Sequence, residues 1–231
     1  MPRVPGSALL TAEEIGESRL WPVAAVLTAA SLYATMPGSY IAGSATLVTV
    51  GRIVVPTLAV ALIWPLALTA PRRSIRVSMP RRSAALALIA VISVANAVSI
   101  VLLVHLLVIG AHIDGRALLR AAIHIWCASV LVFALWFWQL DSGGPMARRL
   151  GSRAAGRDFL FTQQAQPELA PPGWQPRFLD YLYLSFTNST AFSPTDTMPL
   201  TQWAKMLMLV ESAASLLLLL MVAARAVNIL Q

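Results

Sequence analysis

Glu211 is the residue whose position most strongly indicates chemistry. It lies about a third of the way along an apolar run, residues 203–230, that is long enough to cross a bilayer. An ionised carboxylate at the bilayer centre costs about 2.5–3.5 kcal/mol on insertion scales, so Glu211 must face protein or water. Two interpretations stay open. Glu211 is either a cation or proton site with Asp196 at its mouth, or a hydrogen-bonded packing residue beside Ser212 and Ser215.

The segment that precedes this run is too short and too polar to cross a bilayer. Residues 178–186 are aromatic and apolar, four polar residues follow at 187–190, and Pro194 breaks any helix before Asp196. Non-helical backbone is allowed at membrane depth only where protein or a water-filled cavity surrounds it. We therefore predict a re-entrant half-helix here. The candidate ion pathway is Thr187, Thr190, Ser193, Asp196 and Glu211.

The three histidines and the single cysteine are the candidates for metal or haem ligation. His124 and Cys127 are three residues apart on one helical face, and His105 and His112 are seven apart. A zinc site needs three or four convergent ligands, and the only acid near this set is Asp114. We predict no metal and no cofactor. We also predict that the protein is not an enzyme, because the sequence has no nucleophile-elbow glycines, paired carboxylates or phosphate-binding glycine loop.

The elements that must position these residues follow from composition. Of the 231 residues, 58% are hydrophobic and 12% are charged, about half the charged fraction of ordinary globular proteins. The lipid bilayer is therefore the main partner. We predict an all-α, multi-pass transmembrane helical bundle with five spans and one re-entrant half-helix. The expected spans are residues 20–37, 53–71, 84–110, 117–140 and 203–230.

Four regions follow from these spans. Residues 1–19 form an N-terminal surface segment, 20–140 a four-helix transmembrane region, 141–177 a polar loop with little fixed structure, and 178–231 the half-helix and last transmembrane helix. The single cysteine excludes an internal disulfide. Asn96, with Ser93 and Ser99, is expected to form hydrogen bonds between helices.

The net charge of +7 indicates an orientation rather than a nucleic-acid partner, because the basic residues lie in short loops between apolar runs. Residues 71–83 contain five arginines and no acid. If five spans alternate, thirteen of the 17 basic residues share one side, which puts the N-terminus in the cytoplasm.

Two resemblances concern the last quarter of the chain. The stretch SFTNSTAFSPTDTMPLT resembles the pore helix, filter and outer mouth of bacterial two-transmembrane-type potassium channels. Thr190, Asp196 and Pro199 fall on the matching threonine, aspartate and proline. Residues 191–195 lack both glycines of the TVGYG filter, whose backbone carbonyls select potassium, so that selectivity is not expected. In those channels the pore loop enters from outside, whereas the charge count places 141–177 inside.

The FLDYLYLSF run and the final AVNIL resemble a widespread bacterial family of integral membrane proteins of unknown function. That family has a pore-like C-terminal arrangement without a potassium filter. The resemblance implies a multi-pass protein of the bacterial plasma membrane with no assigned function. From the pore-like segment we predict a channel-like conduit for a small cation with a non-standard filter. It would form a homo-oligomer, because one such module cannot enclose a pore. The alternative is a non-conducting scaffold that binds partner proteins through its basic inner loops.

Overall fold

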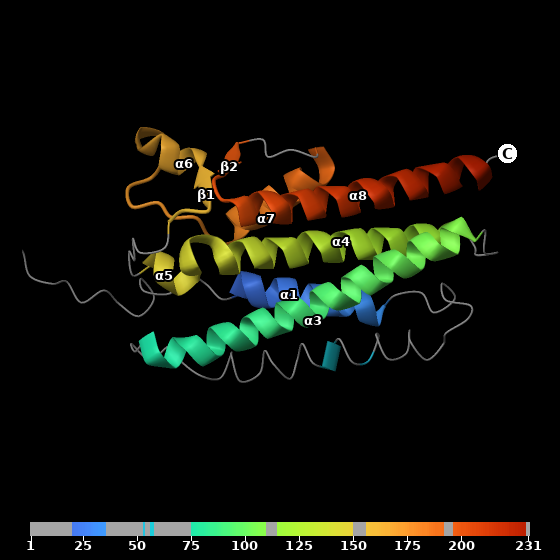
Figure 1. Ribbon diagram of the computed structural model, residues 1–231, viewed down its shortest axis with the longest axis horizontal. Helices are drawn as coiled ribbons and strands as arrows, with labels where there is room; N and C mark the ends of the chain where they lie inside the picture. The colour runs from blue at the N-terminus through green and yellow to red at the C-terminus, as the bar shows by residue number, and fades with distance from the viewer. Residues whose placement is uncertain are drawn as a thin grey trace, which may run out of the picture.

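The computed structural model describes residues 20–35, 53, 56–57, 75–109, 115–149, 156–191 and 196–229. Its longer helices are α1 (Leu20–Ala34), α3 (Ile75–Val108), α4 (Gly115–Leu140), α7 (Phe178–Ala191) and α8 (Gln202–Ile229). The shorter elements are η2 (Asp141–Gly143), α5 (Pro145–Arg149), β1 (Phe159–Phe161), α6 (Thr162–Ala165), η3 (Pro167–Leu169) and β2 (Thr197–Pro199). The longer helices lie side by side along the long axis, and α5, α6, β1 and β2 gather at one end, here called the β end (Figure 1).

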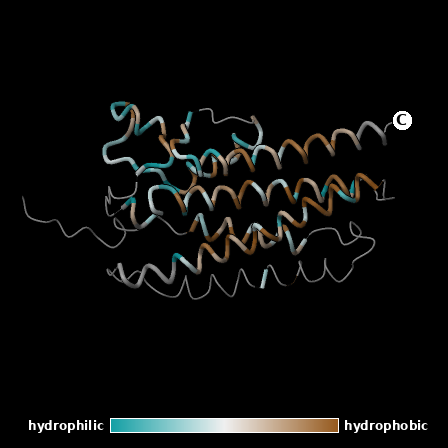
Figure 2. The backbone as a smooth tube through the Cα atoms, in the orientation of Figure 1, coloured by the Kyte–Doolittle hydropathy of each residue, from teal (hydrophilic) through white to brown (hydrophobic). Residues whose placement is uncertain are grey.

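Three described helices are long and apolar enough to cross a membrane, which confirms the predicted helical class. Their apolar stretches are Arg82–Val108, Gly115–Gly143 and Gln202–Ala224, and hydrophobic residues predominate along them (Figure 2). Helix α1 has 15 residues and a length of about 22 Å, less than the roughly 30 Å of a bilayer core. The expected span 53–71 lies almost wholly outside the described residues. The count of five spans therefore stays a prediction.

Helix α3 begins earlier than its predicted span. We expected residues 71–83 to be a loop, but the backbone is already helical from Ile75. Hydropathy indicates where the apolar run begins, not where the helix begins. Arginine is a good helix former, so the helix already includes part of the basic segment that precedes the apolar residues.

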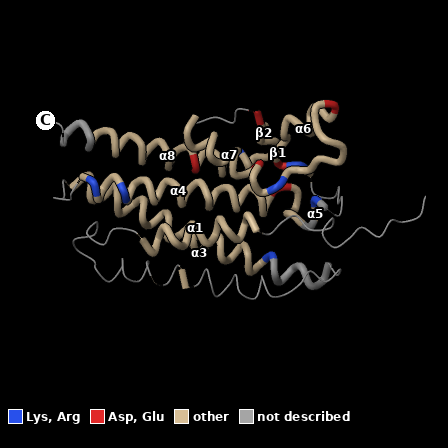
Figure 3. Tube along the Cα trace, turned by 180° about the vertical axis from the view of Figure 1, so that it is seen from behind, with Lys and Arg blue, Asp and Glu red and all other residues tan. Residues whose placement is uncertain are grey.

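Helix α4 is the centre of the bundle. It packs against α1, α3, α7 and α8, and 56% of its most apolar stretch is buried, against 28% for α3 and 22% for α8. The outer faces of α3 and α8 are therefore apolar and exposed, as expected of helices that face lipid. Most charged residues of the described chain lie toward the two ends of the bundle (Figure 3).

Polar side chains join α1, α3 and α4 inside the bundle. The Tyr33 hydroxyl donates to Asn96 Oδ1 over 2.9 Å, and Asn96 Nδ2 donates to Ser129 Oγ over 2.5 Å. The Trp136 indole N–H donates to Ser93 Oγ over 2.8 Å. Asn96 and Ser93 thus form hydrogen bonds between helices, as predicted. Ser99 donates to the Ala95 carbonyl of its own helix over 2.8 Å.

The prediction of little fixed structure between residues 141 and 177 is wrong. The described parts of this segment contain η2, α5, β1, α6 and η3. Strand β1 pairs with β2 in antiparallel register, with Phe159 opposite Pro199 and Phe161 opposite Thr197. This order depends on a strand that follows α7, about forty residues later in the chain. Composition around residue 160 carries no sign of such a distant partner.

Candidate functional site

Helix α7 is a half-length helix, as the sequence predicts. Its 14 residues give it a length of about 21 Å. In its first turn the Tyr181 ring contacts Phe159 and Phe161 of β1, with centroid separations of 6.5 and 5.3 Å. After α7 the chain returns to β1, because strand β2, which begins at Thr197, pairs with it. The segment from α7 to β2 therefore begins and finishes at the β end, where α8 also begins (Figure 1).

Glu211 lies where α4, α7 and α8 meet. Its side chain is fully buried. One carboxyl oxygen contacts Ser185 Oγ, and the other accepts a hydrogen bond from Asn188 Nδ2 over 2.7 Å. Ser185 Oγ also lies 2.8 Å from the Val130 carbonyl of α4. Ser212 Oγ donates to Asn188 Oδ1 over 3.1 Å. Ser185, Asn188, Glu211 and Ser212 are here called the polar centre.

The polar centre is a layer between two apolar clusters. Toward the β end lies a cluster that includes Leu184 and Met208, and toward the other end lies one that includes Ile125 and Leu218. Glu211 and Ser185 are both 0% exposed. A hollow of about 700 Å³ at the β end is lined mainly by residues between 156 and 176, and none of the polar centre lines it. In this conformation the carboxyl group of Glu211 is closed off from water.

The structure does not bring the other described pathway candidates to Glu211. Thr187 Oγ1 donates to the Tyr183 carbonyl over 2.9 Å, and Thr190 Oγ1 to the Phe186 carbonyl over 2.8 Å. Both hydroxyls thus bond to the backbone of α7 one turn earlier and not to Glu211. Asp196 is exposed beside β2, where its backbone carbonyl accepts from Thr162 Oγ1 over 2.8 Å. Ser193 lies outside the described residues.

The residues that do contact Glu211 were missed from the sequence. Ser185 and Asn188 are three positions apart on α7 and share a face with the buried Tyr181. This spacing places them in one row along the helix. The signal was therefore present as an i, i+4, i+7 pattern of Tyr181, Ser185 and Asn188. The apolar character of the segment predicts a half-helix but does not indicate which of its faces is buried.

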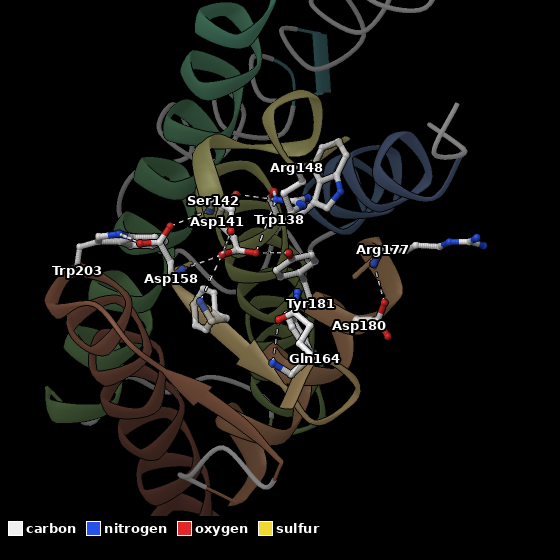
Figure 4. A network of polar contacts seen from close by, with 12 residues as sticks. Trp138, Asp141, Ser142, Arg148, Asp158, Gln164, Arg177, Asp180, Tyr181 and Trp203 are labelled. Carbon is white, nitrogen blue, oxygen red and sulfur yellow. Dashed lines mark hydrogen bonds and ion pairs between the residues drawn. The ribbon is translucent and has the colours of Figure 1, made fainter. Parts of the chain in front are cut away.

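A second buried network fixes the start of α7 (Figure 4). Asp141, 1% exposed, accepts hydrogen bonds from the Tyr181 hydroxyl over 2.5 Å and from the backbone N–H groups of Asp158 and Phe159 over 3.1 and 3.3 Å. The Arg148 guanidinium lies 3.9 Å from the same carboxylate and 5.0 Å from the Tyr181 ring centroid. These contacts tie the first turn of α7 to the end of α4 and to β1.

Asp158 fixes the start of α8 in the same way. Its carboxylate accepts from the Ser142 backbone N–H over 2.8 Å, from the Thr201 hydroxyl over 3.0 Å and from the Trp203 indole over 2.7 Å. Both helices that form the polar centre are thus held at the β end by a buried aspartate. We interpret Asp141 and Asp158 as positioning residues for α7 and α8.

The start of α7 is next to an acidic and a basic residue, whereas its last turn has no basic side chain to offset the helix dipole. Near its start, Asp180 Oδ2 accepts from the Arg177 backbone N–H over 2.6 Å. Burial raises the pKa of Asp180, and the hydrogen bond and charge of Arg177 oppose that shift. The last turn of α7 carries no basic residue. Its C-terminal carbonyls therefore carry the negative end of the helix dipole, equivalent to about half an electron charge.

Neither a metal-binding cluster in the described residues nor a similar known protein points to a function. Within the described residues, no three His, Cys, Asp or Glu side chains are close enough together to hold a metal ion. Comparison of the chain with known protein families, curated proteins and solved structures finds no match.

Proposed function

We propose that this protein passes a small cation across a membrane through the unit formed by α7 and α8, with Glu211 as the site that the cation occupies. The observation that carries this proposal is the fully buried carboxyl group of Glu211, held against a half-length helix by Ser185 and Asn188. A carboxyl group inside an apolar bundle is unfavourable, and such groups commonly mark ion pathways.

The electrostatics of α7 favour a cation over an anion. Asn188, which contacts Glu211, is three residues from the end of α7 at Ala191. The last carbonyls of a helix have no partner within it and attract positive charge. Half-helix ends of this kind coordinate cations in membrane transporters. The helix end and the carboxyl group therefore supply negative potential in the same part of the bundle.

A homo-oligomer around α8 belongs to the same proposal. The exposed apolar residues of α8 include Leu209, Val210, Leu216 and Leu220, which are 43–59% exposed. One α7–α8 unit cannot surround a pore, so the exposed face of α8 would contact lipid on one side and a second copy on the other. Crosslinking of single cysteines on this face in a Cys127→Ala background tests the assembly, and a monomer at all positions would contradict it.

The proposed location is the bacterial plasma membrane, with the N-terminus and the β end on the cytoplasmic side. Cysteine accessibility tests this orientation. Leu169 at the β end and Val108 at the opposite end of α3 are each 71% exposed. In a Cys127→Ala background, an impermeant thiol reagent added to intact cells should label Val108→Cys and spare Leu169→Cys. The reverse pattern would contradict the orientation.

Flux measurements test the function itself. Purified protein is placed in vesicles, and the flux of H⁺, Na⁺ and K⁺ is compared with that of empty vesicles. We expect flux of at least one of these ions, and Glu211→Gln should abolish it. Thr187→Val is the matched control, because the Thr187 hydroxyl bonds only to backbone carbonyls of its own helix in the described structure. Flux equal to that of empty vesicles for every ion would refute the proposal. Normal flux in a folded Glu211→Gln variant would assign Glu211 to packing.

A further inference from the structure

We propose that the cation taken by Glu211 is a proton, and that Glu211 is a neutral carboxylic acid in this conformation, with its O–H directed at Ser185. This inference rests on the proposed function, because it names the ion of the same site. The observation behind it is the number of hydrogen atoms in the polar centre, because each close contact between two oxygens needs one hydrogen.

The amide of Asn188 can be oriented first. One of its terminal atoms lies 3.0 Å from the Met208 backbone carbonyl, which only accepts hydrogen bonds. That atom must therefore be the NH₂ group. Its second N–H points to Glu211 Oε2 over 2.7 Å, and its carbonyl oxygen accepts from the Ser212 hydroxyl. Glu211 Oε2 is thus an acceptor, and Oε1 is the carboxyl oxygen that faces another oxygen, Ser185 Oγ, to which a proton could be donated.

The hydroxyl of Ser185 decides the state of Oε1. Ser185 has one proton but two close oxygen neighbours, the Val130 carbonyl and Glu211 Oε1. If Glu211 were ionised, one of these contacts would be two oxygens facing each other without a hydrogen. If Oε1 carries a proton, it donates to Ser185 Oγ, and Ser185 donates to Val130. Only the neutral acid gives each contact one hydrogen.

The same geometry disfavours a metal cation. Hard metal ions such as Ca²⁺ and Mg²⁺ take about six or more oxygen ligands. At Glu211 one carboxyl oxygen faces the Asn188 N–H, whose positive hydrogen would repel a cation. Among the described residues, the hydrogen-bonding contacts to the Glu211 carboxyl group come from Ser185 and Asn188, neither of which is charged. A proton needs no further ligands, and as the neutral acid Glu211 avoids the penalty of a buried charge.

Two buried groups mark the side on which the proton would exchange. Three buried side-chain atoms have no hydrogen-bond partner among the described residues: Arg148 Nη2 at the β end, and Trp126 Nε1 and Ser215 Oγ inside the helical bundle. Ser215 is one turn beyond Glu211 on α8, and Trp126 is one turn before Val130 on the antiparallel α4. Both therefore lie on the side of Glu211 away from the β end. Buried groups of this kind commonly bind internal water, which can accept a proton.

Exchange of the proton requires a conformation that admits water to Glu211, because the carboxyl group is fully buried here. In that conformation the Oε1–H bond of Glu211 breaks, the proton goes to a water molecule, and the carboxylate keeps the electron pair. Ser185 then turns its O–H from the Val130 carbonyl to Oε1, while Asn188 continues to donate to Oε2. The carboxylate thus has two hydrogen-bond donors after release. Reprotonation reverses both movements, so Ser185 changes direction with each proton that Glu211 takes or gives.

Infrared spectroscopy of the full-length protein in vesicles tests this proposal. Wild-type protein at neutral pH should show the carbonyl band of a protonated carboxylic acid, and the band should be lost in Glu211→Gln. Gln can donate to Ser185 and accept from Asn188, so this variant should fold. Ser185→Ala should shift the band by removing its acceptor. Ser189→Ala should leave it unchanged, because the Ser189 hydroxyl donates to the Phe186 carbonyl of its own helix over 2.9 Å.

The infrared and flux results separate the two proposals. A Glu211-dependent acid band together with H⁺ flux that Glu211→Gln abolishes would support both. No Glu211-dependent band at neutral pH would overturn the proton inference. If Na⁺ or K⁺ flux were then lost in Glu211→Gln, the proposed function would stand without it. A normal band without flux of any ion would support the neutral acid and refute passage of a cation.

Discussion

Tyr181→Phe tests the positioning role of Asp141. Tyr181 is fully buried, and its hydroxyl donates over 2.5 Å to the Oδ2 atom of Asp141. The other hydrogen bonds to this carboxylate, from a serine hydroxyl and two backbone N–H groups, reach Oδ1. Among the residues that the structure describes, Oδ2 would therefore keep only the guanidinium of Arg148, 3.9 Å away. Phe retains the ring and its contacts with β1, so the variant removes one hydrogen bond and little packing.

Hydrogen bonds to charged groups contribute about 1.5–3 kcal/mol, and we expect a loss in that range in the free energy of unfolding. The assay is unfolding by a denaturing detergent in mixed micelles, followed by tryptophan fluorescence. The matched control is Tyr183→Phe, two residues along the same helix, where the side chain is 52% exposed. That variant should stay within about 0.5 kcal/mol of wild type. Equal losses in the two variants would refute the assigned role.

A double-mutant cycle separates the pair from its surroundings. Asp141→Asn alone should also destabilise the protein, because an amide is a poorer acceptor than a carboxylate for the Tyr181 hydroxyl. If the two residues act through one hydrogen bond, the double variant should lose less than the sum of the single variants, with a coupling of about 0.5–3 kcal/mol. Additive losses would mean that Tyr181 stabilises α7 through packing and not through Asp141.

Three further predictions concern other parts of the chain. Asn96→Leu removes the two hydrogen bonds that Asn96 makes with Tyr33 of α1 and Ser129 of α4, and the same unfolding assay should show a loss of about 0.6–1.7 kcal/mol, from the average to the largest value measured for such bonds in membranes. Gly144→Ala places a Cβ atom 2.9 Å from a backbone carbonyl oxygen at φ +95° and should destabilise by about 1–3 kcal/mol, whereas Gly156→Ala, with no atom within 4 Å, should be neutral. Because burial raises the pKa of Asp180, its contribution to stability is present below its ordinary pKa and lost as the pH rises through the folded value. Unfolding of Asp180→Asn measured against pH should lack that decline, and an unchanged profile would contradict it.

The parts of the fold that were predicted correctly depend on local patterns. The apolar runs 84–110, 117–140 and 203–230 correspond to α3, α4 and α8, because about 20 consecutive apolar residues can be stable only inside lipid or a large core. The half-helix α7 was found because polar residues and Pro194 follow its short apolar part. The β1–β2 ribbon could not be found in this way, because its two strands lie on either side of α7.

The candidate site shows the same division. Glu211 stands out from the sequence because a carboxyl group within an apolar run is a local anomaly. Its contacts with Ser185 and Asn188 are not local, since 26 and 23 residues separate them along the chain. The sequence predicts Thr187 and Thr190 on the same half-helix as pathway residues because of their hydroxyls, yet these hydroxyls bond to the backbone of α7.

The sequence by itself therefore determined that this chain forms apolar helices, that one helix is half-length, and that one carboxyl group lies within an apolar helix. Hydrophobicity, helix length and the effect of proline depend on neighbouring residues, so they can be read along the chain. The tertiary structure decided which face of α7 meets Glu211 and how Asp141 and Asp158 hold both helices at the β end. These contacts depend on the rotation of each helix about its axis, and that rotation is set by packing against helices distant in the sequence.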